Sequence, residues 1–397
     1  MKPSFIGIVS LFLLVYATAV YYAGLRLLQS LGEIIAQCSG YYWGIYVLVA
    51  CTPFISWLGR AHFPRRLNDW ITVGGNYWLA VLYYLVVCWA VVDSVRLAVG
   101  LFSPAEPGPP PAWLATAVTV LVACLLAYGI WNARHPRIRR YDVTIGKAVA
   151  GLTGLRAVMV SDVHLGVMID NSRLAVMVEQ INQLQPDIVF LAGDTIDEDV
   201  ALFIERNMAA VLSQLTPKYG VYAVMGNHEY LGGQGLLAAQ ALEHVGVQVL
   251  RDRYVKVDEQ FYVVGRDDPT VGRMSGTRRL PLPAVMQGVD RSVPVILLDH
   301  QPQNLTEGQQ LGVDLQLSGH THHGQFFPNN LVTERLFELD WGYLRKGAYQ
   351  AIVSCGYGTW GPPVRIGNQP ELVDIRITFN NSGEEGGSQA QKQPEPV

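Results

Sequence analysis

The order of hydrophobic and polar positions divides the chain into an apolar N-terminal third and a longer part in which short apolar runs alternate with mixed stretches. Before residue 134, four windows contain no Asp, Glu, Lys or Arg: Pro3–Leu25, Ile34–Gly59, Ile71–Val92 and Pro107–Ala133. Each approaches or exceeds the roughly 20 residues that cross a bilayer as a helix. Tyr and Trp cluster near several window ends, as in the aromatic belts of membrane proteins. The windows predict a four-helix transmembrane region over residues 1–133.

Lys and Arg residues predict how these helices are oriented in the membrane. They flank the windows mainly on one side, at Lys2, Arg60, Arg65, Arg66, Arg134, Arg137, Arg139 and Arg140. The opposite side carries only Arg26 and Arg96. Because cytoplasmic loops are enriched in Lys and Arg, the N-terminus and all residues after 133 are expected to be cytoplasmic. The sequence therefore predicts a multi-pass protein of the cytoplasmic (inner) membrane, with its C-terminal part facing the cytoplasm.

An alternative for the first window is a cleaved signal peptide. Ala17-Thr18-Ala19 resembles a signal-peptidase site that follows a short apolar stretch. Cleavage there would leave three helices and an external N-terminus, and the next window would still run inward. The C-terminal part would face the cytoplasm in both cases.

Two segments of the C-terminal part have the composition of connections rather than of a core. Residues 134–150 begin with several arginines and are predicted to form a basic juxtamembrane linker. Such a stretch is attracted to anionic headgroups by about 1 kcal/mol per basic residue, although anchoring the topology is the simpler role. Residues 381–397 are mostly Gly, Glu, Gln, Ser and Pro, a composition that predicts a disordered tail.

Between these segments, five short apolar runs each end in residues that commonly bind metals. They are Val158–Val160 before Ser161-Asp162-Val163-His164, Ile188–Ala192 before Gly193-Asp194, Val221–Met225 before Gly226-Asn227-His228-Glu229, Val293–Leu298 before Asp299-His300, and Leu315–Leu317 before Ser318-Gly319-His320-Thr321-His322. Ligands of open α/β sheets gather at the carboxyl edge of the strands. The five runs therefore predict a sheet whose strand ends converge on a metal centre.

The stretches between the runs predict the fold class. Apolar residues recur at helical spacing in Asn171–Gln185, Leu202–Leu215 and Leu236–Val245. Further runs have the character of strands, at Val247–Leu250, Tyr254–Val257, Phe261–Val264, Ala351–Ser354 and Leu372–Phe379. Alternating strands and helices predict an α/β domain over residues 151–380, and the surplus of strands predicts a second sheet packed on the first.

The polar residues after the runs predict the kind of metal site. The candidate ligands are two Asp, one Asn and four His, namely Asp162, Asp194, Asn227, His164, His300, His320 and His322. Gly193, Gly226 and Gly319 each precede a candidate ligand, where a residue without Cβ allows a sharp turn. Seven ligands are too many for one tetrahedral ion and suit two ions that share a carboxylate, the arrangement that stabilises in-line phosphoryl displacement. Imidazole and carboxylate ligands without thiolate suit two divalent Mn, Fe, Zn or Co ions.

Composition limits the partners and the compartment. The 397 residues are 50% hydrophobic and carry a formal net charge of −4. A negative net charge gives no indication of the basic surface patch that nucleic-acid binding usually needs, so no nucleic-acid partner is expected. Four of the five cysteines lie in the apolar N-terminal region and none forms a CxxC pair. Buried cysteines in a reducing compartment fit this pattern better than a disulfide framework.

The five blocks resemble the motif set of the calcineurin-like metallophosphoesterases. Asp162-x-His164, Gly193-Asp194, Gly226-Asn227-His228-Glu229, His300 and Gly319-His320-x-His322 follow one another in the family's order. The similarity runs from about residue 154 to 378, and with the apolar windows before it the chain is most similar to the bacterial transmembrane type. The resemblance implies a β-sandwich of two sheets flanked by helices, with the metals at one edge.

The resemblance also implies a role for each candidate residue. It implies a first metal held by Asp162, His164, Asp194 and His322, and a second held by Asp194 as the bridging carboxylate, Asn227, His300 and His320. His228 would not be a ligand but would contact the phosphate and protonate the leaving group. The implied nucleophile is a metal-bound hydroxide, without a covalent intermediate.

The sequence thus predicts a membrane-anchored dinuclear-metal phosphohydrolase that cleaves a phosphomonoester, phosphodiester or pyrophosphate bond. A lipid-linked or membrane-proximal substrate is preferred, because the helices and the basic segment would confine the site to the bilayer surface. Some members of the superfamily act on diacylated glucosamine nucleotides, which makes a lipid diphosphate a reasonable substrate. The alternatives are a phosphodiesterase for a soluble substrate such as a cyclic nucleotide, and a non-catalytic metal-binding scaffold. Such scaffolds typically lack a ligand or the proton donor, and none is missing here.

Overall fold

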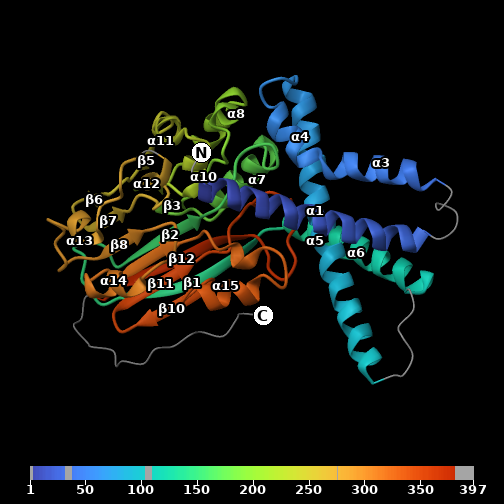
Figure 1. The fold of residues 1–397 in the computed structure, drawn as a ribbon. Helices are drawn as coiled ribbons and strands as arrows, with labels where there is room; N and C mark the ends of the chain where they lie inside the picture. The colour runs from blue at the N-terminus through green and yellow to red at the C-terminus, as the bar shows by residue number, and fades with distance from the viewer. Residues whose placement is uncertain (1–2, 32–37, 103–109, 275, 381–397) are drawn as a thin grey trace. The chain divides into compact units, whose positions relative to one another are not determined.

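The computed structural model describes residues 3–31, 38–102, 110–274 and 276–380 (Figure 1). Contacts between Cα atoms divide the chain into two compact units: Met1–Trp131 with Gly361–Val364, and Asn132–Trp360 with Arg365–Val397. The tail predicted to be disordered, 381–397, lies outside the described residues. Each unit has its own architecture.

The first unit consists of apolar helices. They are α1 (Pro3–Leu31), α3 (Ser39–Ala50), α4 (Thr52–Gly59), α5 (Arg65–Leu101) and α6 (Ala112–Ala133), the last two residues of α6 belonging to the second unit. Three segments are long and apolar enough to cross a membrane, namely Ile6–Gln29, Arg65–Leu101 and Ala112–Ala133. The pair α3 and α4, bent by 46°, makes a fourth if it forms one span. Pro53 in the first turn of α4 has no N–H to continue the α3 hydrogen-bond ladder, which accounts for the break.

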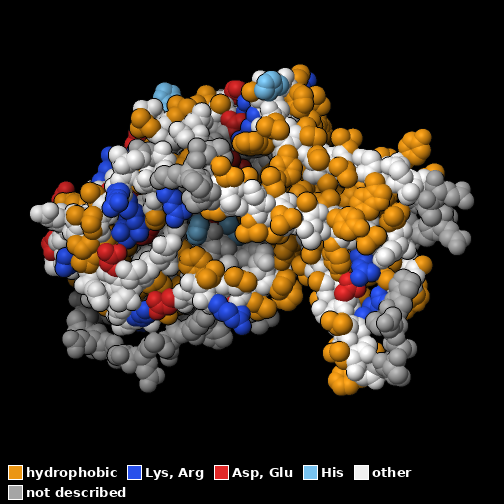
Figure 2. All heavy atoms as spheres, viewed as in Figure 1, with side chains coloured by type: hydrophobic (Ala, Val, Ile, Leu, Met, Phe, Trp, Pro, Cys, Tyr) orange, Lys and Arg blue, Asp and Glu red, His pale blue; other side chains and the backbone are white. Residues whose placement is uncertain are grey.

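The surface of these helices has the character expected for contact with lipid. Figure 2 shows mainly apolar side chains over the N-terminal helices, with few charges among them. On α1, for example, Ile8 is 67% exposed and Leu14 is 64% exposed. Large apolar side chains that face outward in such numbers are a property of membrane-spanning helices rather than of soluble ones.

One ion pair lies between two of the long helices, where the sequence analysis expected uncharged spans. The predicted windows end before Arg26 and Asp93, but α1 and α5 continue past them. Arg26 Nη2 lies 2.5 Å from Asp93 Oδ2, and the hydroxyl of Tyr22 also donates to this carboxylate. The Arg26 guanidinium lies 5.2 Å from the ring centre of Trp89. The pair leaves neither charge alone within the helix bundle.

The second unit contains two six-stranded sheets. The first has the order β1 (Arg137–Ile145), β12 (Glu371–Phe379), β2 (Gly154–Val160), β3 (Ile188–Ala192), β4 (Val221–Val224) and β5 (Val247–Val249). The second has the order β10 (Gly342–Lys346), β11 (Tyr349–Val353), β9 (Leu315–Ser318), β8 (Val295–Leu298), β7 (Phe261–Gly265) and β6 (Arg253–Val257). Strands β2 to β5 are mutually parallel, as are β7, β8, β9 and β11. Their carboxyl ends therefore open at one edge of each sheet.

Helices cover the outer faces of both sheets. They are α7 (Asn171–Gln183), α8 (Val200–Glu205), α9 (Met208–Leu212), α10 (Asn227–Leu231), α11 (Gly235–Glu243), α12 (Val271–Met274), α13 (Leu282–Val285) and α14 (Leu305–Gln310). A further helix, α15 (Asn330–Leu336), has no buried residue. The period of two along β2 explains the layers, because Ala157 and Met159 pack between the sheets whereas Val158 and Val160 pack under α7. Residues of α13 and α14 cover the other sheet. Since both faces of the central strands β3, β4, β7 and β8 are buried, these strands are continuously apolar. The predicted two-sheet sandwich flanked by helices is confirmed.

The segment predicted to be a basic linker, 134–150, is not a linker along its whole length. Residues Arg137–Ile145 form β1, which pairs in parallel with β12 over nine residues. Arg139 Nε lies 3.1 Å from Glu371 Oε2, and Arg140 Nε lies 3.3 Å from Asp374 Oδ2. The two arginines therefore pair with carboxylates of β12, which offsets part of the charge expected to attract headgroups.

Two smaller expectations were also wrong. The helix predicted over Leu202–Leu215 is divided into α8 and α9, because Asn207 adopts a left-handed conformation with φ 52°. Strand β10 was not predicted at all, since Gly342–Lys346 is only partly buried and lacks a continuous apolar run.

Candidate metal centre

The seven candidate ligands follow the carboxyl ends of five strands. Asp162 and His164 follow β2, Asp194 follows β3, Asn227 follows β4, His300 follows β8, and His320 and His322 follow β9. The sequence analysis placed all five strands in one sheet, but β8 and β9 belong to the second sheet. The ligands thus come together where the carboxyl edges of the two sheets meet.

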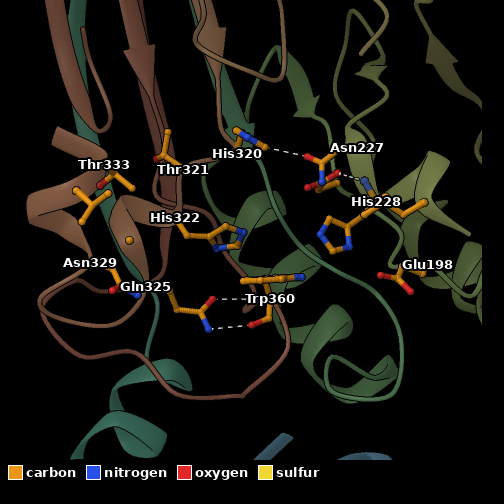
Figure 3. A pocket seen from close by; sticks show the side chains of 14 residues that line it. Glu198, Asn227, His228, His320, Thr321, His322, Gln325, Asn329, Thr333 and Trp360 are labelled. Carbon is orange, nitrogen blue, oxygen red and sulfur yellow. Dashed lines mark hydrogen bonds between the residues drawn. The ribbon is translucent and has the colours of Figure 1, made fainter. Parts of the chain in front are cut away.

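Two groups of nitrogen and oxygen atoms lie close enough for each to hold an ion. The ligand atoms of Asp162, His164 and His322 lie within 4.8 Å of one another, and so do those of Asp194, His300 and His320. In the first group, His164 Nε2 lies 3.1 Å from His322 Nε2, which lies 3.4 Å from Asp162 Oδ1. Beside the second group, His320 Nδ1 lies 2.8 Å from the amide oxygen of Asn227 (Figure 3).

Asp194 lies between the two groups. Its Oδ2 atom is 3.2 Å from Nε2 of His300 and 4.0 Å from Nε2 of His164. Its Oδ1 atom accepts a hydrogen bond of 2.8 Å from the backbone N–H of His228. Burial favours the neutral form, but the charges of the neighbouring histidines, that of His300 first, outweigh it and hold the pKa of the Asp194 carboxyl well below its usual range. Asp194 therefore has the position and the charge of a bridging carboxylate.

The Nε2 atom of His300 faces a carboxylate oxygen and needs a proton or a metal ion between the two. Its Nδ1 atom lies 2.8 Å from the carbonyl oxygen of Ala192, which can only accept a hydrogen bond, so the N–H of a neutral ring lies at Nδ1. Its Nε2 atom is buried without a hydrogen-bond partner among the described residues, although the Asp194 carboxylate is 3.2 Å away. Two acceptors this close need a cation between them, either a proton or a metal ion. A ring held through its other nitrogen by a carbonyl is the usual arrangement of a metal-binding histidine.

The backbone at these positions is strained. Five candidate ligands adopt positive φ values that non-glycine residues rarely occupy: Asp162 (53°), His164 (52°), Asp194 (49°), His320 (74°) and His322 (48°). Each such conformation raises the free energy of the folded state by on the order of 1–3 kcal/mol and persists only where the surroundings fix it. Strain gathered at one strand-end cluster is characteristic of a functional site.

The three glycines before the ligands act in two different ways. Gly193 has φ +89°, so its turn needs the freedom of glycine, as predicted. Gly226 and Gly319 do not turn in this way and are instead sites of close approach. A Cβ at Gly226 would lie 2.1 Å from Asp194 Oδ1, and one at Gly319 would lie 2.3 Å from Asp162 Oδ2. The carboxylates occupy the space that any other side chain would fill.

His228 points into the same region without joining the two main groups. Its Nδ1 atom lies 2.9 Å from Asp197 Oδ1, and its ring meets that of His164 edge-on with centres 4.6 Å apart. Burial lowers the pKa of His228, but the hydrogen bond to Asp197 and the charge of Asp194 outweigh it and raise the pKa to about 9. The ligand atoms of His164, Asp194 and His228 also lie within 4.8 Å of one another. His228 is thus placed to hold a proton beside the candidate metal positions.

Two carboxylates outside the seven candidate ligands support the site. The Asp197 side chain lies against His228. The Glu229 carboxylate accepts hydrogen bonds from the backbone N–H groups of Asp194 (3.1 Å), Ile196 (2.9 Å) and Gly226 (2.8 Å). Burial and the charge of Asp194 raise the pKa of Glu229 to about 7. Their proximity to Asp194 and His228 in sequence was the only signal for these contacts.

A cleft of about 440 Å³ opens over the candidate metal centre (Figure 3). It is lined by Asp194, Glu198, Asn227, His228, Leu231, His320, Thr321, His322, Gly324, Gln325, Asn329, Val332, Thr333 and Trp360. The Gln325 side chain fixes the backbone of Trp360 by two hydrogen bonds of 2.9 Å. Its amide oxygen accepts from the backbone N–H of Trp360, and its amide nitrogen donates to the backbone carbonyl oxygen. No Lys or Arg is among these described lining residues. The cleft thus combines a buried polar floor with exposed apolar side chains at Leu231, Val332 and Trp360.

Comparisons with known proteins agree with this geometry. The calcineurin-like phosphoesterase family matches residues 155–324. A transmembrane protein with metallophosphoesterase domain from Danio rerio is 31% identical over 268 residues, which cover 64% of this chain and 61% of that protein. A metallophosphoesterase from Aquifex aeolicus is 34% identical over 262 residues, which cover 65% of this chain and 98% of that protein. The chain therefore spans nearly the whole bacterial relative but only about three fifths of the Danio rerio protein.

Solved structures show a weaker likeness. A dimetal phosphatase from Danio rerio shares 15% identity at a TM-score of 0.30, covering 51% of this chain and 87% of that one. The sequence relatives carry the assignment, because one of them is matched almost end to end at more than 30% identity. The chain belongs to the calcineurin-like phosphoesterase family of metal-dependent phosphoesterases.

Proposed function

We propose that this chain is a membrane-anchored phosphohydrolase that works with two divalent transition-metal ions. Asp162, His164, Asp194 and His322 would hold the first ion, and Asp194, Asn227, His300 and His320 the second. The observation that carries this proposal is the position of Asp194, whose Oδ2 atom lies within 4.0 Å of histidine nitrogens in both groups. The buried lone pair of His300 facing this carboxylate also supports a metal ion at the second position.

The donor set supports the choice of ion and of chemistry. Imidazole, carboxylate and amide ligands without thiolate suit Mn, Fe, Zn or Co. When bound, such a pair of ions activates water at neutral pH and stabilises the charge of an in-line phosphoryl displacement. The protein's part is to hold Asp194 and Asn227 in place and to bring the histidine nitrogens to the same two positions.

His228 is the proposed proton donor to the leaving group. Its Nδ1 atom is engaged by Asp197, so the Nε2 atom is left to face the cleft, which His228 lines. A pKa of about 9 keeps the ring protonated at neutral pH, and bound cations would lower this value toward the range in which a general acid works best. Asp197 therefore orients the ring and stabilises its charged form.

The preferred substrate is a lipid-linked or membrane-proximal phosphoester or pyrophosphate. The apolar helices support it, because they hold the domain at a bilayer. The cleft supports it independently, since none of its described lining residues is Lys or Arg while Leu231, Val332 and Trp360 are exposed beside the polar floor. A substrate with many negative charges would find no Lys or Arg among the described lining residues, which also argues against nucleic acid. A soluble phosphodiester such as a cyclic nucleotide is the second candidate, supported by the exposed Trp360 ring as a stacking surface.

The location proposed for the protein is the cytoplasmic membrane, with the catalytic domain facing the cytoplasm. The Lys and Arg asymmetry of the loops supports this orientation. Residues 1–133 would form the transmembrane region. The phosphoesterase domain, predicted over 151–380, would also include β1 because that strand completes the first sheet. Labelling of single cysteines placed at the exposed residues 62 and 259 from either side of sealed vesicles would test this orientation.

The function is tested on the full chain purified in detergent. We expect about two transition-metal ions per chain by elemental analysis and metal-dependent hydrolysis across a panel of phosphomonoesters, phosphodiesters, cyclic nucleotides and lipid diphosphates. Asp194→Asn should abolish both, because it removes the shared carboxylate. Higher kcat/KM on dispersed lipid phosphates than on soluble esters supports the lipid assignment, and the reverse supports the soluble alternative. A protein without bound metal and without esterase activity would instead be a scaffold.

A further inference from the structure

A buried arginine outside the predicted site lies directly behind one of the candidate ligands. Arg365 is 0% exposed, and its Nη2 atom lies 3.2 Å from His322 Nδ1. The same nitrogen donates to the carbonyl oxygens of Cys355 (2.8 Å), Gly356 (3.2 Å) and Gly358 (2.6 Å). Among the described residues, backbone carbonyls rather than a carboxylate satisfy this guanidinium. A buried charge held in this way fixes the geometry of everything it touches.

The loop that Arg365 organises also holds the backbone of another ligand. The Tyr357 N–H donates to the carbonyl oxygen of Ser161 (2.9 Å), and the Gly358 N–H donates to that of Asp162 (2.8 Å). Gly358 has no room for a side chain there, since a Cβ would lie 2.1 Å from the Val163 carbonyl oxygen. Arg365 thus touches His322 directly and reaches Asp162 through this loop.

Two asparagines extend the contact in opposite directions. Arg365 Nη1 donates to Asn368 Oδ1 (2.9 Å), and Asn368 Nδ2 donates to the carbonyl oxygens of His322 and His323 (3.1 Å each). Asn132 Nδ2 donates to the carbonyl oxygens of Arg365 (3.0 Å) and Asn368 (2.7 Å). Asn132 is 0% exposed. Asn132, Arg365 and Asn368, here called the Arg365 network, form one continuous set of hydrogen bonds ending at His322.

The network begins at the end of a predicted membrane span. Asn132 and Ala133 are the last two residues of α6, yet they belong to the compact unit of the catalytic domain. The Ala133 carbonyl oxygen also accepts a hydrogen bond of 2.8 Å from Arg173 Nη2. Residues Gly361–Val364, which immediately precede Arg365, group with the membrane helices. The chain thus passes from the membrane unit into the network at two points, before Asn132 and before Arg365.

We propose that the Arg365 network is a positioning device that couples the end of α6 to His322, and so to the first metal position. The proposal rests on the dinuclear function proposed above. Residues that hold a metal ligand from behind typically change metal affinity by 10–100-fold when they are mutated. Among the described residues, the side-chain hydrogen bonds of Asn132 lead to the metal position through Arg365 and Asn368. An effect of Asn132 on one metal position would therefore be the signature of the coupling.

The test measures binding of Mn²⁺ to the metal-free full chain in lipid nanodiscs by equilibrium dialysis, for Asn132→Asp and Arg365→Lys. The aspartate keeps the shape of Asn132 but removes the two N–H donors of its amide. The lysine keeps the charge of Arg365 but removes the planar guanidinium with its several N–H donors. We expect one of the two Mn²⁺ equivalents to bind about 10–100-fold more weakly, while the other binds as in the wild type. Arg173→Lys is the matched control, because it alters a contact to the same helix end outside the network and should leave both equivalents unchanged.

Two further measurements separate positioning from general destabilisation. The melting temperature of each metal-free variant reports on folding alone, and added guanidinium should restore the weakened equivalent in Arg365→Ala. The coupling would be refuted if Asn132→Asp bound both Mn²⁺ equivalents with wild-type affinity. It would also be refuted if the affinity fell equally at both positions and the melting temperature of the metal-free variant fell as well. In both cases a wild-type enzyme that binds two ions and hydrolyses phosphoesters leaves the proposed function standing. A wild type without metal binding would remove the proposed function and this inference together.

Discussion

The proposed role of His228 makes a prediction that depends on the leaving group of the substrate. The ring is held at Nδ1 by Asp197 at 2.9 Å and lines the cleft. Substituting His228→Ala removes the proton donor without removing a proposed metal ligand. An alkoxide leaving group needs a proton as the P–O bond breaks, whereas p-nitrophenolate leaves without one. The loss of activity should therefore be large on alkyl phosphoesters and small on p-nitrophenyl esters.

The size of the loss follows from what a positioned acid contributes. General acid catalysis is typically worth about 10²–10⁴-fold in rate, which corresponds to about 3–5 kcal/mol at 1.36 kcal/mol per tenfold change. We expect kcat/KM of His228→Ala to fall by that factor on an alkyl ester and by about tenfold or less on the p-nitrophenyl ester. The assay is steady-state hydrolysis of both esters at saturating Mn²⁺.

His323 provides the matched control for this experiment. It is a buried histidine next to the cluster, paired at 2.7 Å with Asp340, and it does not line the cleft. His323→Ala should change the rates on both esters by the same factor. An equal loss on both esters for His228→Ala would refute the assignment of this residue as the acid. It would instead favour a role for His228 in binding the phosphate or an ion.

The remaining predictions concern the pH profile, the ligand geometry, the sheet and the helices. Asp197→Asn removes the negative charge that helps to raise the pKa of His228, so the basic limb of the pH–rate profile should move to lower pH. Gly226→Ala places a Cβ 2.1 Å from Asp194 Oδ1 and should lower metal content measured by elemental analysis, whereas Gly146→Ala, with no atom within 4 Å, should not. Burial raises the pKa of Asp374, but Arg156 outweighs it and lowers the pKa, so its stabilisation is present above the unfolded value and is lost as pH falls. Asp374→Asn should therefore reduce stability by about 1 kcal/mol at pH 7, because the partner is partly exposed, and the two melting temperatures should converge as the pH falls below the lowered pKa of Asp374. Asp93→Asn, which leaves Arg26 unpaired in the helix bundle, should lower thermal stability in detergent more than the double variant Arg26→Met/Asp93→Leu.

The parts of the molecule that could be predicted from the sequence are those encoded by local patterns. The runs before Asp162 and Asp194 are continuously apolar because their strands are buried on both faces, and this makes them easy to recognise. A strand end followed at once by a ligand is also a local signal. The seven ligands come together because each motif carries its own strand, its own turn and its own side chain.

The parts that could not be predicted depend on partners that are distant in the sequence. Strand β1 was interpreted as a linker because its arginines have no local partner, and Arg140 pairs with Asp374 across 234 positions. Asp197 could satisfy a helix end or a histidine, and only the folded position of His228 decides between them. Arg365 lies 43 positions after His322, in a loop whose composition indicates no more than a turn. The residues that contact the ligands and hold them in place are brought there by the tertiary structure, whereas the ligands themselves can be recognised in the sequence.

The division of ligands between the sheets has a physical consequence for the whole domain. The first sheet supplies the two carboxylates, Asp162 and Asp194, and the second supplies three imidazoles, those of His300, His320 and His322. Carboxylates gathered at one edge repel one another, and buried lone pairs such as His300 Nε2 are unfavourable without a cation. Ions held between the sheets would relieve both problems, and because they would bind only the folded arrangement they would stabilise it. The strained backbone at five ligands can persist because the two sheets fix it, and ions bound between the sheets would add to this constraint.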